Sequence, residues 1–217
     1  MSEPSDRHER ATQWRNWTGD QRCTPAVRER PGSEGELSAA LARAGAGGSR
    51  VRAVGAGHSF SEIACSEDTL LSLERMSGVL DVDRASGLVR VQAGITINAL
   101  SRQLDAHGLA MENLGDIDVQ SIAGAISTAT HGTGARLRNI SSQVAALKLV
   151  LADGSAIECD GEREPEVFAA ARVGLGALGV VAEVTLRCVP AFTLRGIDEP
   201  APLAQTLERF EALALGN

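Results

Sequence analysis

The chain has 217 residues, a formal charge of −7 at neutral pH, 43% hydrophobic residues and 23% charged residues, which suits one large or two small globular domains. It has no run of lysine or arginine, so we exclude a nucleic-acid partner, which needs a basic face. The four cysteines are scattered without a C-x-x-C pair, which favours reduced thiols over a disulfide or zinc framework.

The first part of the chain predicts small units of helix and strand. No signal peptide is visible in residues 1–10, because they are polar and lack an apolar stretch. A helix is expected over 36–44, ended by Gly45, and a strand is expected over Val51–Val54. That strand runs directly into a turn at 55–59.

The middle of the chain predicts antiparallel pairs separated by helices. In chain order these are a hairpin of 79–83 with 88–92, a helix from 97 to about 107, a hairpin of 144–150 with 156–158, a helix over 166–172 and a strand over 180–189.

The last residues carry an apolar stripe near helical spacing, formed by Leu203, Leu207, Phe210, Leu213 and Leu215. Two interpretations stay open for it. The helix packs back on the preceding domain, or it is the first helix of a second domain that the chain barely enters.

The turn at 55–59 is the strongest candidate site. Glycines at 55 and 57 permit a tight bend that leaves main-chain N–H groups uncovered, and successive uncovered N–H groups bind anions. His58 stands in this turn as a nucleophile or proton carrier. A Rossmann fingerprint is excluded, because its third glycine would fall at Phe60.

A second stretch, 120–134, is rich in glycine, small residues and hydroxyl groups, and it contains His131. Small residues would let a flat ligand lie against the backbone, and the hydroxyls could donate to it. The alternative is a tightly packed helix of small residues that ends at a glycine. Asp116 and Asp118 lack a third ligand for a metal site, and no G-x-S-x-G motif supports acyl transfer.

Several motifs occur in a fixed order: VGAGHS at 54–59, NLG at 113–115, SIAG at 121–124, THGTG at 130–134 and GVVAEVTL at 179–186. Together they resemble the FAD-binding (PCMH-type) domain of the vanillyl-alcohol oxidase superfamily. Within it, they are most similar to the aldonolactone oxidoreductases, which act on L-gulono-1,4-lactone or D-arabinono-1,4-lactone. The resemblance covers roughly residues 12–195.

The resemblance implies an α+β (α/β) fold, the PCMH-type FAD-binding fold of two α/β subdomains. The FAD-binding domain would span 12–190, with subdomains at roughly 12–77 and 78–190. Residues 191–217 would be the truncated start of a substrate domain, which is otherwise missing.

It also implies roles for single residues. The pyrophosphate of FAD would be wrapped by Gly55, Ala56, Gly57, His58 and Ser59, and His58 would carry a covalent bond to the flavin. Ser121, Gly124, Thr128, Thr130 and His131 would line the cofactor, while Val180 and Val181 would meet its adenine or ribityl end. Gly115 would leave room for dioxygen beside the flavin.

The implied activity is FAD-dependent oxidation of a sugar-derived lactone at a CH–OH group, with electrons passed to dioxygen or to a protein or quinone acceptor. Two alternatives remain: an alditol or xylitol oxidase acting on a polyol, or a flavin-binding module without turnover. No catalytic base and no metal ligand are assigned. The expected location is cytoplasmic, with peripheral membrane attachment left open.

Overall fold

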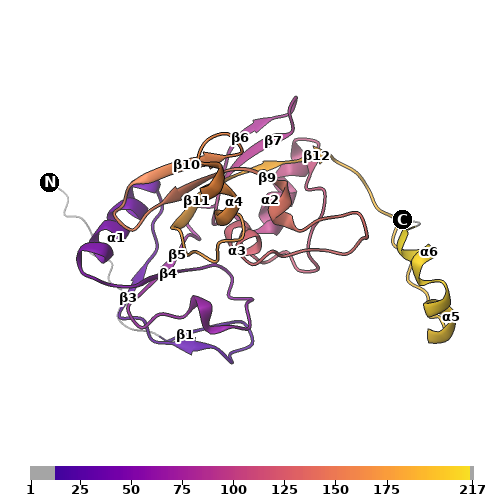
Figure 1. Ribbon diagram of the computed structural model, residues 1–217, viewed down its shortest axis with the longest axis horizontal. Helices are drawn as coiled ribbons and strands as arrows, with labels where there is room; N and C mark the ends of the chain where they lie inside the picture. The colour runs from indigo at the N-terminus through magenta and orange to yellow at the C-terminus, as the bar shows by residue number, and fades with distance from the viewer. Residues whose placement is uncertain (1–12, 216–217) are drawn as a thin grey trace.

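The computed structural model describes residues 13–215; residues 1–12 and 216–217 lie outside the described part, including the first residue of the expected domain. Two main sheets organise the chain (Figure 1). The smaller sheet is parallel, with the order β3-β5-β4 and strands β3 Val27–Glu29, β4 Val51–Val54 and β5 Thr69–Ser72. The larger is antiparallel, with the order β10-β9-β11-β7-β6.

The strands of the larger sheet are β6 Val79–Asp83, β7 Leu88–Gln92, β9 Val144–Val150, β10 Ala156–Asp160 and β11 Val180–Arg187. Their burial follows the sequence pattern. In β7, Val89 and Val91 are fully buried while Arg90 between them is exposed, as expected of a period of two. In the central strand β11, Val180–Ala182 are all buried, and α3 (Ile122–Ser127) packs against this strand.

Helix α1 (Glu34–Ala46) connects β3 to β4 of the smaller sheet and packs against β9 of the larger one. It begins after Ser33, whose hydroxyl accepts the N–H of Glu36, and its Glu34 pairs with Lys148 of β9. Gly45 lies inside the helix rather than ending it as the sequence predicts. A Cβ there would lie 2.6 Å from the carbonyl oxygen of Ala152, so the glycine allows the β9–β10 turn to approach.

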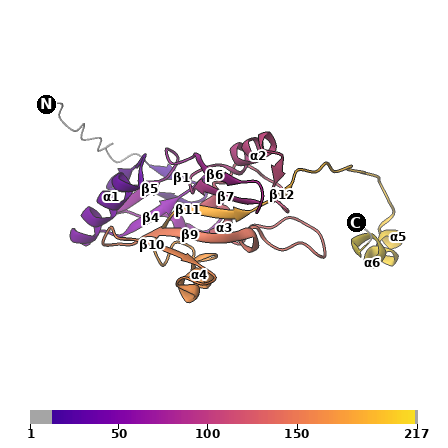
Figure 2. The same ribbon diagram turned by 90° about the horizontal axis from the view of Figure 1, so that it is seen from above.

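Two helices lie on opposite sides of the larger sheet in Figure 2: α2 (Ile97–Ala106) and α4 (Pro165–Ala171). The stripe predicted for α2, with Ile97 and Leu100, is fully buried. A third helix, α3 (Ile122–Ser127), occupies the first half of the stretch that the sequence describes as a glycine-rich loop. The helix interpretation is therefore correct for 122–127.

Short elements complete the fold. The N-terminal hairpin pairs β1 (Trp14–Arg15) with β2 (Arg22–Cys23), and a second small pair joins β8 (Leu109–Ala110) to β12 (Val189–Pro190). Two 3-10 turns, η1 (Glu62–Ala64) and η2 (Ile140–Gln143), lie between longer elements.

The tail forms two short helices, α5 (Leu203–Glu208) and α6 (Phe210–Leu215), beyond an extended segment at 191–202 (Figures 1 and 2). They stand apart from the sheets, and Leu203, Leu207 and Phe210 are each more than half exposed. The interpretation that this helix packs back on the preceding domain is therefore wrong. No helix among residues 13–215 is both long and apolar enough to cross a membrane.

Candidate functional site

A cavity of about 510 Å³ opens between the two sheets. Its walls come from the carboxyl ends of β4 and β5, from the segments at 93–96 and 119–128, and from the first residues of β11. The volume lies within the usual range of small-molecule sites, about 300–1,000 Å³. The edge where parallel strands end is also where open α/β sheets bind ligands.

The turn after β4 presents four unused main-chain amides to this cavity. Within residues 13–215, the N–H groups of Ala56, Gly57, His58 and Ser59 donate to no acceptor. Gly57 has a φ of +69°, which reverses the chain direction at a position that glycine tolerates best. Successive free amides in such a turn form a concave anion site.

The N-terminal hairpin holds this turn in place. The N–H of Trp17 donates to the carbonyl oxygen of Gly57 at 3.0 Å, and Nδ2 of Asn16 donates to the carbonyl oxygen of Ser59 at 3.0 Å. A Cβ at position 57 would lie 3.2 Å from Cζ2 of Trp14, so the hairpin fits closely against the glycine.

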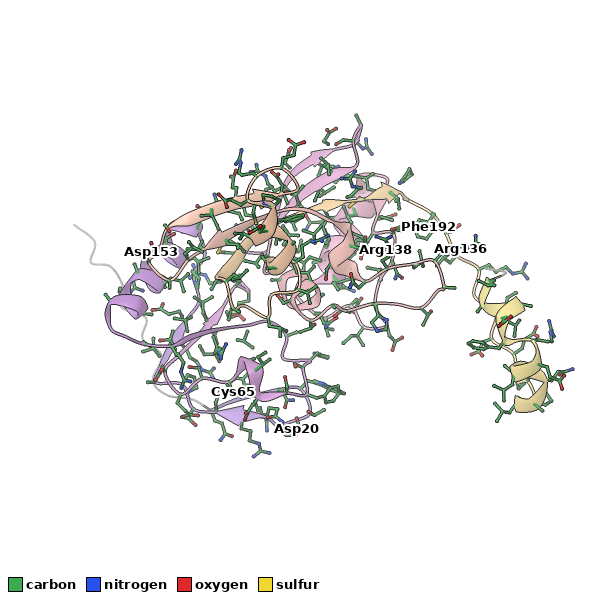
Figure 3. All side chains as sticks on the ribbon, viewed as in Figure 1. Asp20, Cys65, Arg136, Arg138, Asp153 and Phe192 are labelled. Carbon is green, nitrogen blue, oxygen red and sulfur yellow. The ribbon has the colours of Figure 1, made fainter. Side chains whose placement is uncertain are left out.

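An acidic side chain in turn orients Asn16, which is only 3% exposed. Asp20 accepts hydrogen bonds from the hydroxyl of Thr18 and from Nδ2 of Asn16, and these bonds lower the pKa of Asp20. The carboxylate therefore stays charged and fixes the amide that holds Ser59. Figure 3 labels Asp20 in the hairpin turn and Cys65 after η1, both at the lower edge of that view.

His58 lies against an aromatic ring rather than free in the cavity. The indole of Trp17 stacks on its imidazole, with centroids 5.1 Å apart and planes 5° from parallel, and the rings of Phe60 and Trp17 meet edge-on with centroids 6.0 Å apart. Nδ1 of His58 is 3.4 Å from the carbonyl oxygen of Ala56.

The opposite wall comes from α3, which touches the turn directly. A Cβ at Gly55 would lie 2.5 Å from Oγ of Ser121, and that hydroxyl accepts the N–H of Gly124 at 3.2 Å. The first amides of this helix are already used, because Ile122 and Ala123 donate to main-chain carbonyls before α2. The helix therefore supplies a small-residue wall, whereas the free donors lie in the turn at 56–59.

The structure places the expected site residues in two groups. Ten of them line the cavity: Gly55, Ala56, Gly57, His58, Ser59, Ser121, Gly124, Thr128, Val180 and Val181. The other three, Gly115, Thr130 and His131, form a neighbouring cluster outside the cavity wall.

This neighbouring cluster is linked to the cavity through one side chain. A Cβ at Gly115 would lie 2.9 Å from Cγ2 of Thr130, and Thr130 Oγ1 accepts a hydrogen bond at 3.2 Å from Nε2 of Gln120, which lines the cavity. His131 meets the carbonyl oxygen of Gly132 through Nδ1 at 2.8 Å. Oε1 of Gln120 is buried without a partner among the described residues, a state that costs free energy unless a ligand donates to it.

Sequence reasoning missed several cavity residues. Leu73 and Glu74 follow β5, and the rule that parallel strands end at one edge could have found them beside the turn after β4. Leu175 and Gly176, in the loop before β11, carried no such signal. Nothing in the sequence placed Trp17 against His58.

The comparisons with known proteins agree with this geometry. A family model described as "FAD binding domain" matches residues 25–160. L-gulono-1,4-lactone dehydrogenase of Mycobacterium tuberculosis is 48% identical over 204 residues, which are 94% of this chain and 47% of that protein. L-gulonolactone oxidase of Mus musculus is 40% identical over 203 residues, 94% of this chain and 46% of that protein.

A solved structure, solvent-stable cholesterol oxidase, shares the fold with a TM-score of 0.74 at 24% identity, over 87% of this chain and 40% of that one. The chain therefore spans about half the length of the curated relatives it matches.

Proposed function

Because this chain belongs to the FAD binding domain family, we propose that the cavity holds FAD with its diphosphate on the free amides of residues 56–59. Three observations support the fit. The turn at 55–59 has no room for a side chain at Gly55, and the wall opposite consists of small residues. The buried Oε1 of Gln120 has no hydrogen-bond donor among the described residues. Many phosphate groups are bound in turns of successive main-chain N–H groups of this kind.

The remaining cavity residues receive the following roles. Ser121, Gly124 and Thr128 form the wall along the cofactor, and the backbone at Val180 and Val181 meets its adenine or ribityl end. Their common position on one cavity supports this assignment. We assign Gly115, Thr130 and His131 to the neighbourhood of the flavin ring, because Gln120 connects them to the cavity.

We propose His58 as the attachment point of a covalent flavin. That bond would join a ring nitrogen of His58 to the flavin 8α-carbon. The imidazole N–H proton and one hydrogen of the 8α-methyl group would be lost with two electrons, and together they would reduce dioxygen to hydrogen peroxide. His58 lines the cavity and stands between two of the free amides, which supports this role. Precipitation with trichloroacetic acid should leave a yellow pellet from the flavin-loaded chain and a colourless one from His58→Ala. A colourless wild-type pellet from protein that had bound FAD would disprove the attachment.

The reaction we propose is oxidation of a sugar lactone of the L-gulono- or D-arabinono-1,4-lactone type at a CH–OH group, with dioxygen or another acceptor taking the electrons. Bound FAD supplies the hydride acceptor for such chemistry. Main-chain amides and small side chains of this chain hold and orient the cofactor. The similarity to the lactone dehydrogenase and oxidase carries this proposal.

A second candidate is a flavin-binding module without turnover. It is favoured because no catalytic base is assigned among residues 13–215. Reduction of a dye acceptor by the FAD-loaded chain separates the two. Bleaching that requires L-gulono-1,4-lactone supports the oxidoreductase and excludes the module, whereas bleaching with xylitol alone indicates a polyol oxidase. Bound FAD with no bleaching on either substrate supports the module.

A further inference from the structure

We propose that Trp17 is the positioning residue of His58, so that its loss slows covalent attachment of FAD far more than it weakens FAD binding. The inference rests on the attachment at His58 proposed above. It concerns a residue of the N-terminal hairpin, about forty positions away from the turn that it controls.

The hairpin first fixes the main chain on both sides of His58. The carbonyl oxygen of Gly57 accepts from the Trp17 N–H at 3.0 Å, and that of Ser59 accepts from Nδ2 of Asn16 at 3.0 Å. Asn16 is almost fully buried, so its bond to Ser59 is sheltered from competing water. The peptide unit before His58 and the one after Ser59 are thus held by the hairpin, which leaves rotation of the imidazole as a freedom of the side chain.

Trp17 restricts that rotation. Its indole lies parallel to the imidazole within 5° at a centroid distance of 5.1 Å, and a turn of the imidazole about its last bond would break this stack. The other polar contact of the ring, from Nδ1 to Ala56, is 3.4 Å long, beyond the usual range for a strong hydrogen bond. The stack is therefore the principal contact that sets the plane of the ring.

The position of Trp17 is otherwise unexplained by packing. The side chain is 58% exposed, so it contributes little to the core, and its ring contacts are with His58 and Phe60. Exposing a large aromatic side chain to water is unfavourable. What this position provides is a fixed orientation of the reactive histidine. Bond formation depends steeply on such orientation, since a misplacement of ~1 Å can cost ~100-fold in rate.

The test measures attachment and binding separately on the full 217-residue chain. Apoprotein is mixed with FAD, samples are precipitated with acid over time, and flavin in the pellet gives the rate of attachment. Fluorescence titration gives the Kd for FAD on His58→Ala variants, in which no bond forms. The variants are Trp17→Leu, which removes the aromatic ring, and Trp17→Phe, which keeps one. Leu80→Ala removes an exposed apolar side chain of β6 outside the cavity wall as a matched control.

We expect Trp17→Leu to lower the attachment rate about tenfold or more while the Kd for FAD changes less than about threefold. Trp17→Phe should recover most of the rate, and Leu80→Ala should match the wild type. A second measurement needs no cofactor. In the NMR spectrum, the ring protons of His58 should show an upfield ring-current shift that disappears in Trp17→Leu.

Attachment by Trp17→Leu at the wild-type rate would overturn the proposal for Trp17 alone. Equal losses of attachment rate and FAD affinity in Trp17→Leu that Trp17→Phe fails to restore would also overturn it, since they indicate a merely structural role. A wild-type chain that binds FAD without any acid-stable flavin would instead overturn the attachment at His58, and the role of Trp17 with it.

Discussion

A close contact between Gly55 and Ser121 ties the two walls of the cavity together, and Gly55→Ala tests it. The new Cβ would lie 2.5 Å from Oγ of Ser121, a separation that real Cβ atoms do not adopt. The methyl group must therefore displace the hydroxyl that accepts the Gly124 N–H at the start of α3. We expect the free energy of unfolding to fall by about 1–3 kcal/mol, the usual cost of overpacking a fixed site.

Ser121→Ala provides the background that isolates this contact. Alone it removes a helix cap and should cost about 1 kcal/mol. Once the hydroxyl is gone, Cβ of residue 121 lies 3.6 Å from the new methyl carbon, which is an ordinary contact. The double variant should therefore be as stable as Ser121→Ala alone, within about 0.5 kcal/mol.

Urea unfolding followed by circular dichroism measures all four proteins of this cycle. Gly35→Ala serves as the control, because it is exposed in α1 and its Cβ would meet no atom within 4 Å. That variant should lose no stability, since alanine is favoured over glycine in a helix. If the losses of the two single variants simply add in the double variant, the two walls do not touch as described.

Three further predictions concern the frame around the site. Asn16→Ala should lower the free energy of unfolding by about 1–3 kcal/mol in urea, because it removes a buried side chain with three hydrogen bonds; a change near zero would contradict the clamp on Ser59. The hydrogen bond from Lys148 to Glu34 raises the pKa of Lys148, so its stabilising contribution is present at neutral pH and is lost as the pH rises above about 10. Lys148→Met should flatten the alkaline loss of stability, and an unchanged pH profile would refute the link. Burial is the main cause that raises the pKa of Cys65 to about 11, and a hydrogen bond with Cys23 adds to it. Ellman's reagent at pH 8 should therefore label Cys65 roughly 100-fold more slowly than an ordinary thiol. Labelling of Cys65 at the rate of a free thiol would contradict this prediction.

The sequence predicted best where the structure is local. The hairpin of β6 and β7 follows from apolar and polar residues that largely alternate on both sides of a turn at Gly87, whose φ is +72°. Helix α2 follows from a single apolar stripe formed by Ile97, Leu100 and Leu104. In both cases the information lies within about fifteen neighbouring residues, as local pattern rules require.

It predicted less where distant segments meet. Gly45 ends no helix because its neighbour is the β9–β10 turn, a contact about a hundred residues away. The strands β1 and β2 have two residues each, too few to show alternation, so the hairpin that holds the turn at 55–59 was not expected. The stack of Trp17 on His58 depends on that hairpin and was missed with it.

In the candidate site, too, the locally determined part was predicted and the part that depends on distant contacts was not. The turn at 55–59 was found from its glycines, because a tight bend is a local property of the backbone. Its partner wall was predicted as a stretch of small residues and hydroxyl groups, and the sequence did not show that the first amides of α3 are engaged with the segment before α2. Only the tertiary arrangement shows which N–H groups remain available to a ligand.

The diphosphate site is tested most directly by titrating the ¹⁵N-labelled chain with ADP and with FAD while observing its amide resonances. The amides of Ala56, Gly57, His58 and Ser59 should shift with both ligands, because both carry the diphosphate that these four donors are proposed to bind. If either ligand binds and those four resonances stay where they are while others move, the diphosphate lies elsewhere and the account fails.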